Sequence, residues 1–177
     1  MNVCVFCGSN QGGNNIYQST ARSLGASLAY SGHTLVYGGG AIGLMGILAE
    51  SVMQNNGSVI GVIPDFLLKR EVALNSITRL EVVGSMHERK KRMADLSDIF
   101  VAIPGGWGTL DELAEILTWR QLRLISNRIF ILNINNFFNP LLDQMNLMVC
   151  EGFLSRENLD SLEVVGTPAE LISQLSQ

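Results

Sequence analysis

Hydrophobic residues along the chain fall into short runs, each followed by a segment with the three-or-four-residue apolar spacing of a helix that has one buried side. Runs rich in β-branched residues are typical of buried strands. The runs predict strands at residues 2–6, 34–37, 58–63, 80–83, 98–103, 128–133 and 162–165. The periodic segments predict helices at residues 16–31, 86–97, 109–122, 139–153 and 168–176, and one more that ends near Gln54.

The regular alternation of strands and helices predicts the fold class. It is typical of an α/β protein, in which right-handed crossovers connect the strands of a mostly parallel sheet and helices cover both faces. We therefore expect one Rossmann-like, doubly wound domain over residues 1–177. In such sheets, ligands bind beyond the carboxyl ends of the strands.

A glycine-rich turn interrupts the chain at residues 101–112, VAIPGGWGTLDE. A turn of this kind exposes backbone N–H groups at the positive end of a helix dipole, which predicts a phosphate at residues 106–109. Thr109 and Glu112 also fit a capping box, in which they only satisfy donors at the helix start. Gly105, Gly106 and Gly108 exceed what a cap needs, because each costs conformational entropy, and they favour the phosphate site.

A second glycine-rich turn, GGGAIGLMG at residues 38–46, contains the G-x-G-x-x-G spacing of dinucleotide-binding enzymes. An NAD-dependent oxidoreductase is disfavoured, because the following strand offers no acidic residue for the ribose before Asp65. We assign this loop a positioning role beside the ligand, with close helix–strand packing as the alternative. The residues concerned are Gly38, Gly39, Gly40 and Gly43.

A basic run, MHERKKRM at residues 86–93, holds four of the twelve Lys and Arg residues. A solvated helix face is the simple interpretation. However, the helical period cannot turn every residue of the run to one side, so part of it must point inward. We expect Arg89 to be the inward residue, because its planar and permanently charged guanidinium suits the oxygens of a ligand.

Composition narrows the function class. A hydrophobic content of 47% with 16% charged residues excludes disorder and indicates apolar surface buried against a second subunit. A formal net charge of −4 argues against nucleic-acid or membrane-surface binding. No apolar run reaches the roughly 18 to 20 residues of a membrane span and no basic leader is visible, so we expect a cytoplasmic protein. Cys4 and Cys7 are expected as buried apolar side chains, either on opposite faces of the first strand or with one on the strand and one just past it.

Three motifs in this order, GGGxxGLMG, MHERK and PGGxGTxxE, are similar to those of the LOG family, the cytokinin riboside 5′-monophosphate phosphoribohydrolases. The residues REV at 70–72 and LTWRQL at 117–122 extend the resemblance over nearly the whole chain. It implies a Rossmann-like homodimer that hydrolyses the N-glycosidic bond of AMP or an N6-prenylated AMP, releasing free base and ribose 5-phosphate. A catalytically idle nucleotide-binding module is the alternative.

The resemblance also implies site residues by motif position. Arg89 and Glu112 correspond to the catalytic pair, and a carboxylate near the sugar suits a reaction that develops oxocarbenium character. The implied substrate contacts are Glu71, Arg89, Lys90, Gly106, Trp107, Gly108, Thr109, Leu110, Asp111, Glu112 and Thr118. Residues 123–128 depart from the family pattern, and the departure suggests a longer helix there.

Members of this family are often labelled "possible lysine decarboxylase", which raises the question of a pyridoxal cofactor. Such enzymes need a lysine that forms a Schiff base, and the chain has only Lys69, Lys90 and Lys91. No cofactor cradle is recognisable in the sequence. We therefore expect neither a decarboxylase nor a cofactor, and we expect no metal.

Overall fold

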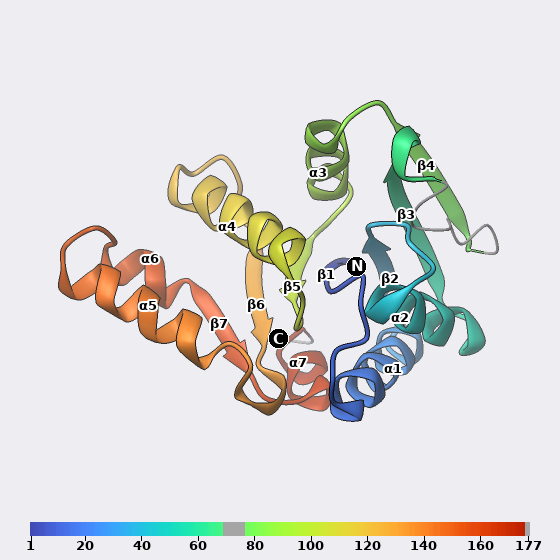
Figure 1. The fold of residues 1–177 in the computed structure, drawn as a ribbon, viewed down its shortest axis with the longest axis horizontal. Coiled ribbons are helices and arrows are strands. Elements are labelled where there is room, and N and C mark those ends of the chain that lie inside the picture. Colours follow the sequence, from blue (N-terminus) through green and yellow to red (C-terminus); the bar gives the residue numbers. More distant parts are fainter. Residues whose placement is uncertain (69–76, 176–177) are drawn as a thin grey trace.

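A seven-stranded parallel sheet forms the centre of the protein (Figure 1). The computed structural model describes residues 1–68 and 77–175. The strand order is β4-β3-β2-β1-β5-β6-β7, so the predicted Rossmann-like α/β class is confirmed. The strands are β1 (Asn2–Phe6), β2 (Thr34–Tyr37), β3 (Ser58–Pro64), β4 (Arg79–Val83), β5 (Ile99–Ala102), β6 (Arg128–Leu132) and β7 (Leu162–Val165).

Helices connect the strands and cover both faces of the sheet (Figure 1). Polar caps fix several of their starts: the Asn14 side chain accepts a hydrogen bond from the Ile16 N–H, and Ser85 accepts one from the Glu88 N–H. The α-helices are α1 (Asn15–Tyr30), α2 (Gly43–Gln54), α3 (Met86–Asp95), α4 (Trp107–Gln121), α5 (Asn139–Cys150), α6 (Arg156–Asp160) and α7 (Pro168–Leu175). Two short 3-10 helices, η1 (Asp65–Leu67) and η2 (Ile134–Asn136), complete the described elements.

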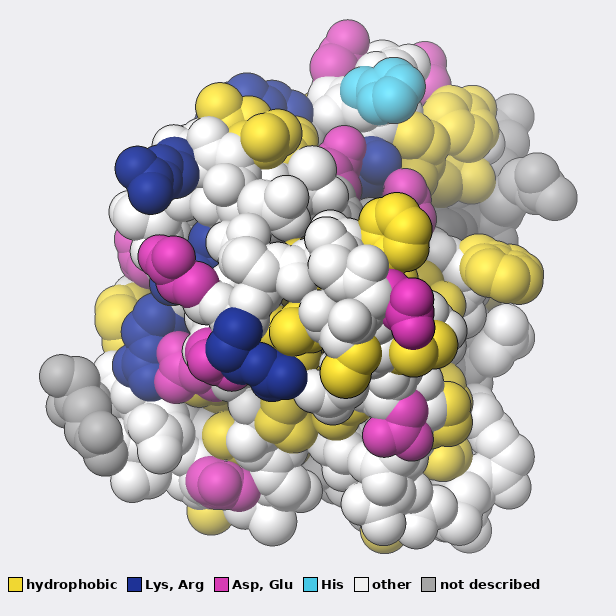
Figure 2. All heavy atoms as spheres, turned by 90° about the vertical axis from the view of Figure 1, so that its left-hand side faces the viewer, with side chains coloured by type: hydrophobic (Ala, Val, Ile, Leu, Met, Phe, Trp, Pro, Cys, Tyr) yellow, Lys and Arg dark blue, Asp and Glu magenta, His cyan; other side chains and the backbone are white. Residues whose placement is uncertain are grey.

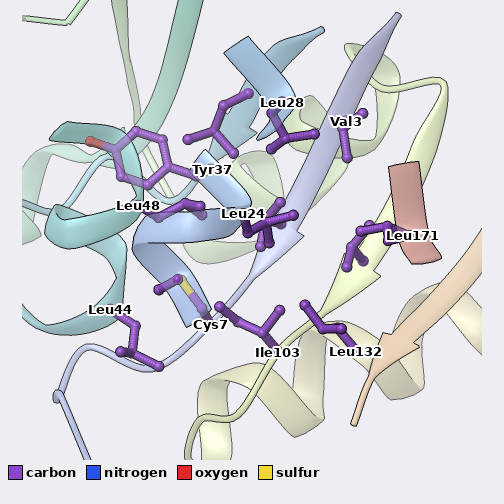
Figure 3. Close-up of a cluster of buried hydrophobic side chains, with 14 of the residues drawn as sticks. Val3, Cys7, Leu24, Leu28, Tyr37, Leu44, Leu48, Ile103, Leu132 and Leu171 are labelled. Atoms are coloured by element: carbon purple, nitrogen blue, oxygen red, sulfur yellow. The ribbon is translucent and has the colours of Figure 1, made fainter. Parts of the chain in front are cut away.

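Two hydrophobic layers hold the sheet, one on each face. The first packs β-strand side chains against α1, α2 and α7, and Figure 3 shows Leu24, Leu48 and Leu171 converging within it. The second packs the other sheet face against α3, α4 and α5. Cys4 belongs to the second layer and Cys7 to the first, both buried and free of disulfides, as their spacing predicted.

The strand order reverses between β1 and β5, and this reversal determines where a ligand can bind. From β1 the chain extends the sheet through β2, β3 and β4 on one side, and β5, β6 and β7 extend it on the other. The loops that follow β1 and β5 therefore diverge to opposite faces, which leaves a crevice at the carboxyl edge of the sheet. The register pairs Phe6 with Ala102 at this edge, so the two loops start side by side.

Most predicted element bounds are confirmed to within a few residues, but the expected longer helix at residues 123–128 is wrong. The helix after residue 109 does not extend into residues 123–128: α4 ends at Gln121. Arg123 has a φ of 59°, and the Leu124 N–H donates to the Trp119 carbonyl at 2.9 Å. This left-handed turn closes the helix end, which the helical propensity of the segment did not reveal.

Within residues 1–68 and 77–175, no helix combines the length and the apolar character needed to cross a membrane.

Candidate active site

A cavity of about 480 Å³ opens at the carboxyl edge of the sheet, where the loops after β1 and β5 diverge. Its walls come from the loop after β1, from Gly38 after β2, from the start of α4 and from Phe137 after β6. Two charged side chains, Arg89 from α3 and Glu112 from α4, line it as well. Segments far apart in the sequence thus meet at the place where doubly wound sheets bind ligands.

The start of α4 forms one wall of this cavity and has the features of an anion site. The helix begins at Trp107, and its N-cap Gly106 supplies no side-chain hydrogen bond. The first backbone N–H groups of a helix have no acceptor within it and lie at the positive end of its dipole. Residues 106–109, which we call the anion site, all line the cavity.

Thr109 lies inside the first turn of α4 rather than at its cap, so the capping-box alternative is wrong. The helix starts two residues earlier than the sequence pattern predicted. The Thr109 side chain is 2% exposed, and its Oγ1 has no hydrogen-bond partner among the residues that the structure describes. The hydroxyl oxygen has almost no exposed surface and lies against Gly105.

Gly105 is needed because the backbone and Thr109 approach it closely. A Cβ at Gly105 would lie 2.0 Å from Thr109 Oγ1 and 2.8 Å from the backbone nitrogen of Gly8. At Gly106 and Gly108 an added Cβ would meet nothing within 4 Å. The protein itself therefore requires glycine at position 105, whereas positions 106 and 108 leave the helix start open on its cavity side.

Arg89 points inward, as predicted from the basic run. It is 5% exposed, its Nε donates to the Val62 carbonyl at 3.1 Å, and its Nη2 donates to the Gly38 carbonyl at 2.7 Å. A Cβ at Gly38 would lie 2.1 Å from Nη2, so a larger residue would displace the guanidinium. The positioning role expected for the second glycine loop thus has a physical basis at Gly38.

The other glycines of that loop serve packing. Gly39 has a φ of 80°, and a Cβ there would press on Ile63. Gly43 has a φ of 66°, and a Cβ there would lie 2.4 Å from the Ser9 carbonyl oxygen. Gly40 is buried. Close packing, the alternative interpretation of this loop, therefore describes Gly39 and Gly43.

Glu112 follows the anion site by one helical turn and lines the same cavity as Arg89. The electrostatics around Cys7 reflect this arrangement. Burial raises the pKa of the Cys7 thiol, and the charge of Glu112 raises it further, whereas the charge of Arg89 lowers it. The thiol at the cavity wall is therefore kept protonated, which makes it a poor nucleophile. Among the described residues that line the cavity, Arg89 and Glu112 are the two with charged side chains.

Four of the residues implied as substrate contacts lie outside this cavity. The Lys90 ammonium contacts Asp111 at 3.1 Å and Glu115 at 3.2 Å. Leu110 and Thr118 line a second depression, and the Thr118 hydroxyl donates to the Ala114 carbonyl. The helical period explains this separation, because residues 110, 111 and 118 project from other sides of α4 than Thr109 and Glu112 do. Glu71 lies outside the described residues.

The second depression, which we call the apolar groove, has a volume of about 360 Å³ and lies between α4, α5 and α6. Its walls are mostly aliphatic and include Leu113, Leu117, Met145 and Met148. Figure 2 faces this part of the molecule and shows hydrophobic side chains at the surface among charged ones. The composition predicted apolar surface of this kind but not its location.

The sequence-based site omitted the loop after β1. Gly8, Ser9, Asn10 and Gly12 all line the cavity, and Tyr17 on α1 lines it too. Tyr17 packs edge-on against Phe137, with ring centroids 5.9 Å apart. The signal was available, since CGSNQGG follows a predicted strand directly, but no motif assigned binding residues there. Trp107 also lines the cavity, although 88% of it is exposed.

Comparisons with known proteins agree on a family. The family model described as "possible lysine decarboxylase" matches residues 45–175. The probable cytokinin riboside 5′-monophosphate phosphoribohydrolase LOGL2 of Oryza sativa subsp. japonica is 42% identical over 175 residues, which cover 99% of this chain and 72% of the relative. The cytokinin riboside 5′-monophosphate phosphoribohydrolase LOG3 of Arabidopsis thaliana is 41% identical, with 99% and 81% covered.

Solved structures are similar in fold at low sequence identity. The molybdenum cofactor carrier protein of Chlamydomonas reinhardtii superposes with a TM-score of 0.73 at 21% identity, with 99% of this chain and 96% of that chain covered. The molybdenum cofactor binding protein of Rippkaea orientalis gives a TM-score of 0.72 at 20% identity, with 99% and 97% covered. These likenesses concern the fold alone.

Proposed function

This chain belongs to the LOG family, whose family model carries the description "possible lysine decarboxylase", and we propose that it is a nucleoside 5′-monophosphate phosphoribohydrolase. The proposed reaction cleaves the N-glycosidic bond of a cytokinin riboside 5′-monophosphate or AMP, giving free base and ribose 5-phosphate. One observation carries the proposal. Arg89 and Glu112 line the same cavity as the anion site, which supports a phosphate and a reacting sugar being held side by side.

The anion site would hold the 5′-phosphate and orient the sugar. Glu112 follows this site by one helical turn, about 5.4 Å, which suits the offset between a 5′-phosphate and the ribose ring. Binding energy from the phosphate, which does not react, then positions the C1′ carbon beside the carboxylate. Residues 106–109 at the start of α4 all line the cavity, which supports this placement.

The chemical step adds water across the glycosidic bond. The water oxygen bonds to C1′, the C–N bond breaks with its electron pair going to the base, and a proton from the water ends on the base nitrogen. Glu112 would stabilise the oxocarbenium-like sugar or accept the proton of the attacking water, and both roles need the carboxylate to be ionised. Arg89 would hold ligand oxygens and stabilise the negative charge that develops on the departing base.

The proposed activity is not a decarboxylation. A pyridoxal enzyme needs a lysine amine facing its site. Neither Lys90 nor Lys91 lines the cavity: Lys90 pairs with two acids of α4, and Lys91 pairs with Asp95 on the surface of α3. Lys69 lies outside the described residues.

The proposal includes a homodimer in the cytoplasm. The apolar groove supports a second copy as a partner, because aliphatic walls of this kind are more stable when another protein surface covers them. Leu110 and Thr118, which the resemblance implies as substrate contacts, lie in this groove, so a substrate role for them would require a site that the subunits share. The three free cysteines support a reducing compartment.

Release of free base from nucleotides tests the proposal. Purified protein is incubated with AMP, isopentenyladenosine monophosphate and adenosine, and the products are separated by chromatography. We expect both monophosphates to yield base and adenosine to be a poor substrate, because adenosine lacks the phosphate anchor. Glu112→Gln should lower the rate by at least about 100-fold, the usual contribution of a positioned acid or base.

Glu50→Gln serves as the matched control, since Glu50 is an exposed glutamate on α2 away from the cavity. Equal rates for the wild type and Glu112→Gln would remove the glutamate from the mechanism. No release from any nucleotide, together with measurable AMP binding, would instead identify a binding module without activity.

A further inference from the structure

We propose that Lys90 is a positioning residue that sets the geometry between Arg89 and Glu112 through an ion-pair bridge from α3 to α4. The bridge consists of Lys90, Asp111 and Glu115. This inference rests on the proposed function, because it concerns how the two proposed catalytic side chains are held. It differs from the substrate contact that the family resemblance implies for Lys90 and Asp111.

The positions of the bridge residues carry the argument. Lys90 follows Arg89 directly on α3, and Asp111 precedes Glu112 directly on α4. The Lys90 Nζ lies 3.1 Å from an Asp111 oxygen and 3.2 Å from a Glu115 oxygen. The contact therefore joins the two helices at the residues next to the proposed catalytic pair.

The bridge links two helices that share one hydrophobic layer but follow different strands. α3 follows β4 at one edge of the sheet, whereas α4 follows β5 near its centre. On its other side α3 is tied to the β4 region, where Arg92 pairs with Glu81 and the Glu88 carboxylate accepts from the Gly84 N–H. Lys90 ties α3 to the helix that carries Glu112.

The two acidic partners keep Lys90 charged although its side chain is largely buried. The Lys90 side chain is 11% exposed, and its partners Glu115 and Asp111 are 24% and 58% exposed, so solvent screens the contact with Glu115 less than the contact with Asp111. Burial by itself lowers the pKa of Lys90, but the hydrogen bonds with Asp111 and Glu115 outweigh it and raise the pKa above its ordinary value. Removing one partner of such a contact leaves a poorly solvated charge, and the two helices are then expected to shift.

The neighbouring lysine provides a natural contrast. Lys91 is 64% exposed and pairs with Asp95. Both residues lie on α3, so this pair does not connect α3 to another element. Lys90 and Lys91 thus differ in burial and in partner but not in residue type or helix. Lys91→Met is therefore a matched control for Lys90→Met.

Steady-state kinetics with AMP distinguish a positioning role from a substrate contact. In a positioning role, Lys90→Met and the double variant Asp111→Asn/Glu115→Gln both lower kcat by about 10- to 100-fold, the effect of misplacing reacting groups by about 1 Å. KM should change by less than about threefold, since substrate binding is retained. Combining all three substitutions should give no further loss, because one bridge is removed in each case.

Two further variants complete the experiment. Lys90→Arg keeps the positive charge and should retain most of the activity, whereas Lys91→Met should behave as the wild type. Circular dichroism and thermal melting show whether each variant folds. If Lys90→Met fails to fold, the comparison of kcat with KM is made on the double variant and on Lys90→Arg.

Three other kinetic results would contradict the bridge or the proposed function. Suppose that Lys90→Met raises KM but leaves kcat unchanged, and that the double variant does not raise KM. Lys90 would then contact the substrate directly, and the bridge would be overturned. Unchanged kinetics in Lys90→Met and in the double variant would overturn it too. If the wild type releases no base from any nucleotide, the proposed function fails, and the positioning role fails with it.

Discussion

The cavity and the apolar groove are lined by different sides of the same helix, and their contrast shows how a motif is divided between two surfaces. Thr109 and Glu112 project from α4 into the cavity, whereas Leu110, Leu113 and Leu117 project into the groove. The motif PGGxGTxxE is continuous in the sequence, but the helical period sends neighbouring residues to different sides. Residues that are continuous in a sequence motif therefore need not all line the same site.

The cavity and the apolar groove also differ in the kind of molecule that their lining side chains can bind. The cavity is lined by a buried arginine and a glutamate, groups that gain from a polar ligand. The groove contains aliphatic side chains, which gain from an apolar cover. The same helix can thus serve chemistry on one side and association on the other, and the two roles are open to separate tests.

The largest effect is expected from enlarging Gly38 on the cavity side. A Cβ at this position would lie 2.1 Å from Arg89 Nη2, so Gly38→Ala should displace the guanidinium and lower base release from AMP by about 100-fold. Gly13→Ala is the control, because a Cβ at Gly13 would meet nothing within 4 Å. Chromatographic rate measurements on the two variants test this. A fully active Gly38→Ala would mean that the observed Arg89 position is not required.

A charge introduced into the apolar groove should weaken the association of two copies of the chain, with a smaller expected effect than Gly38→Ala has on activity. Met148 lines the groove and is 38% exposed, so Met148→Glu should leave the monomer folded while it weakens association. Burying a methionine contributes about 1.5–3 kcal/mol, so we expect the dimer dissociation constant to rise by at least about tenfold. Light scattering during size-exclusion chromatography measures the species present.

Tyr30→Glu is the matched control for this prediction, because Tyr30 on α1 is 78% exposed and does not line the groove. Its association should equal that of the wild type. A Met148→Glu protein that stays dimeric at the lowest measurable concentration would move the interface to another face.

The smallest effect concerns the outer side of α3, which lies away from both depressions. The hydrogen bond from Arg92 lowers the pKa of Glu81 below its ordinary value, although burial opposes this, and the charges of Arg92 and Arg79 contribute in the same direction. A lowered carboxyl pKa stabilises the fold above the unfolded value of about 4.5, and this stabilisation is lost as the pH falls through the lower folded pKa.

Urea unfolding of the wild type and Glu81→Gln at two pH values measures this contribution. We expect a difference of about 1 kcal/mol or less near pH 7, because Arg92 is partly exposed and solvent screens the pair. The difference should become smaller as the pH is lowered from 7 to 3. An undiminished difference at pH 3 would show that packing, and not charge, is what Glu81 contributes.

Much of the fold could be predicted from local patterns. The alternation of strands and helices predicted the sheet class. The helical period of the basic run required part of it to point inward, and the chemistry of the guanidinium selected Arg89, which the structure places inside. The capping box was wrong because the helix starts before Thr109, and the longer helix was wrong because a left-handed turn closes α4. Both errors concern helix ends, where a few backbone angles outweigh the propensity of the segment.

The sequence by itself determined the order of the strands and helices, the glycines that only a crowded or left-handed backbone requires, and the side of each helix that is apolar. These properties depend on neighbours within one or two helical turns. Only the tertiary structure decided which segments meet. β1 lies beside β5 in the sheet, and Arg89 from the helix after β4 reaches the carbonyls of Val62 and Gly38. Strand order and helix packing bring such distant residues together, and no local pattern encodes the distances between them.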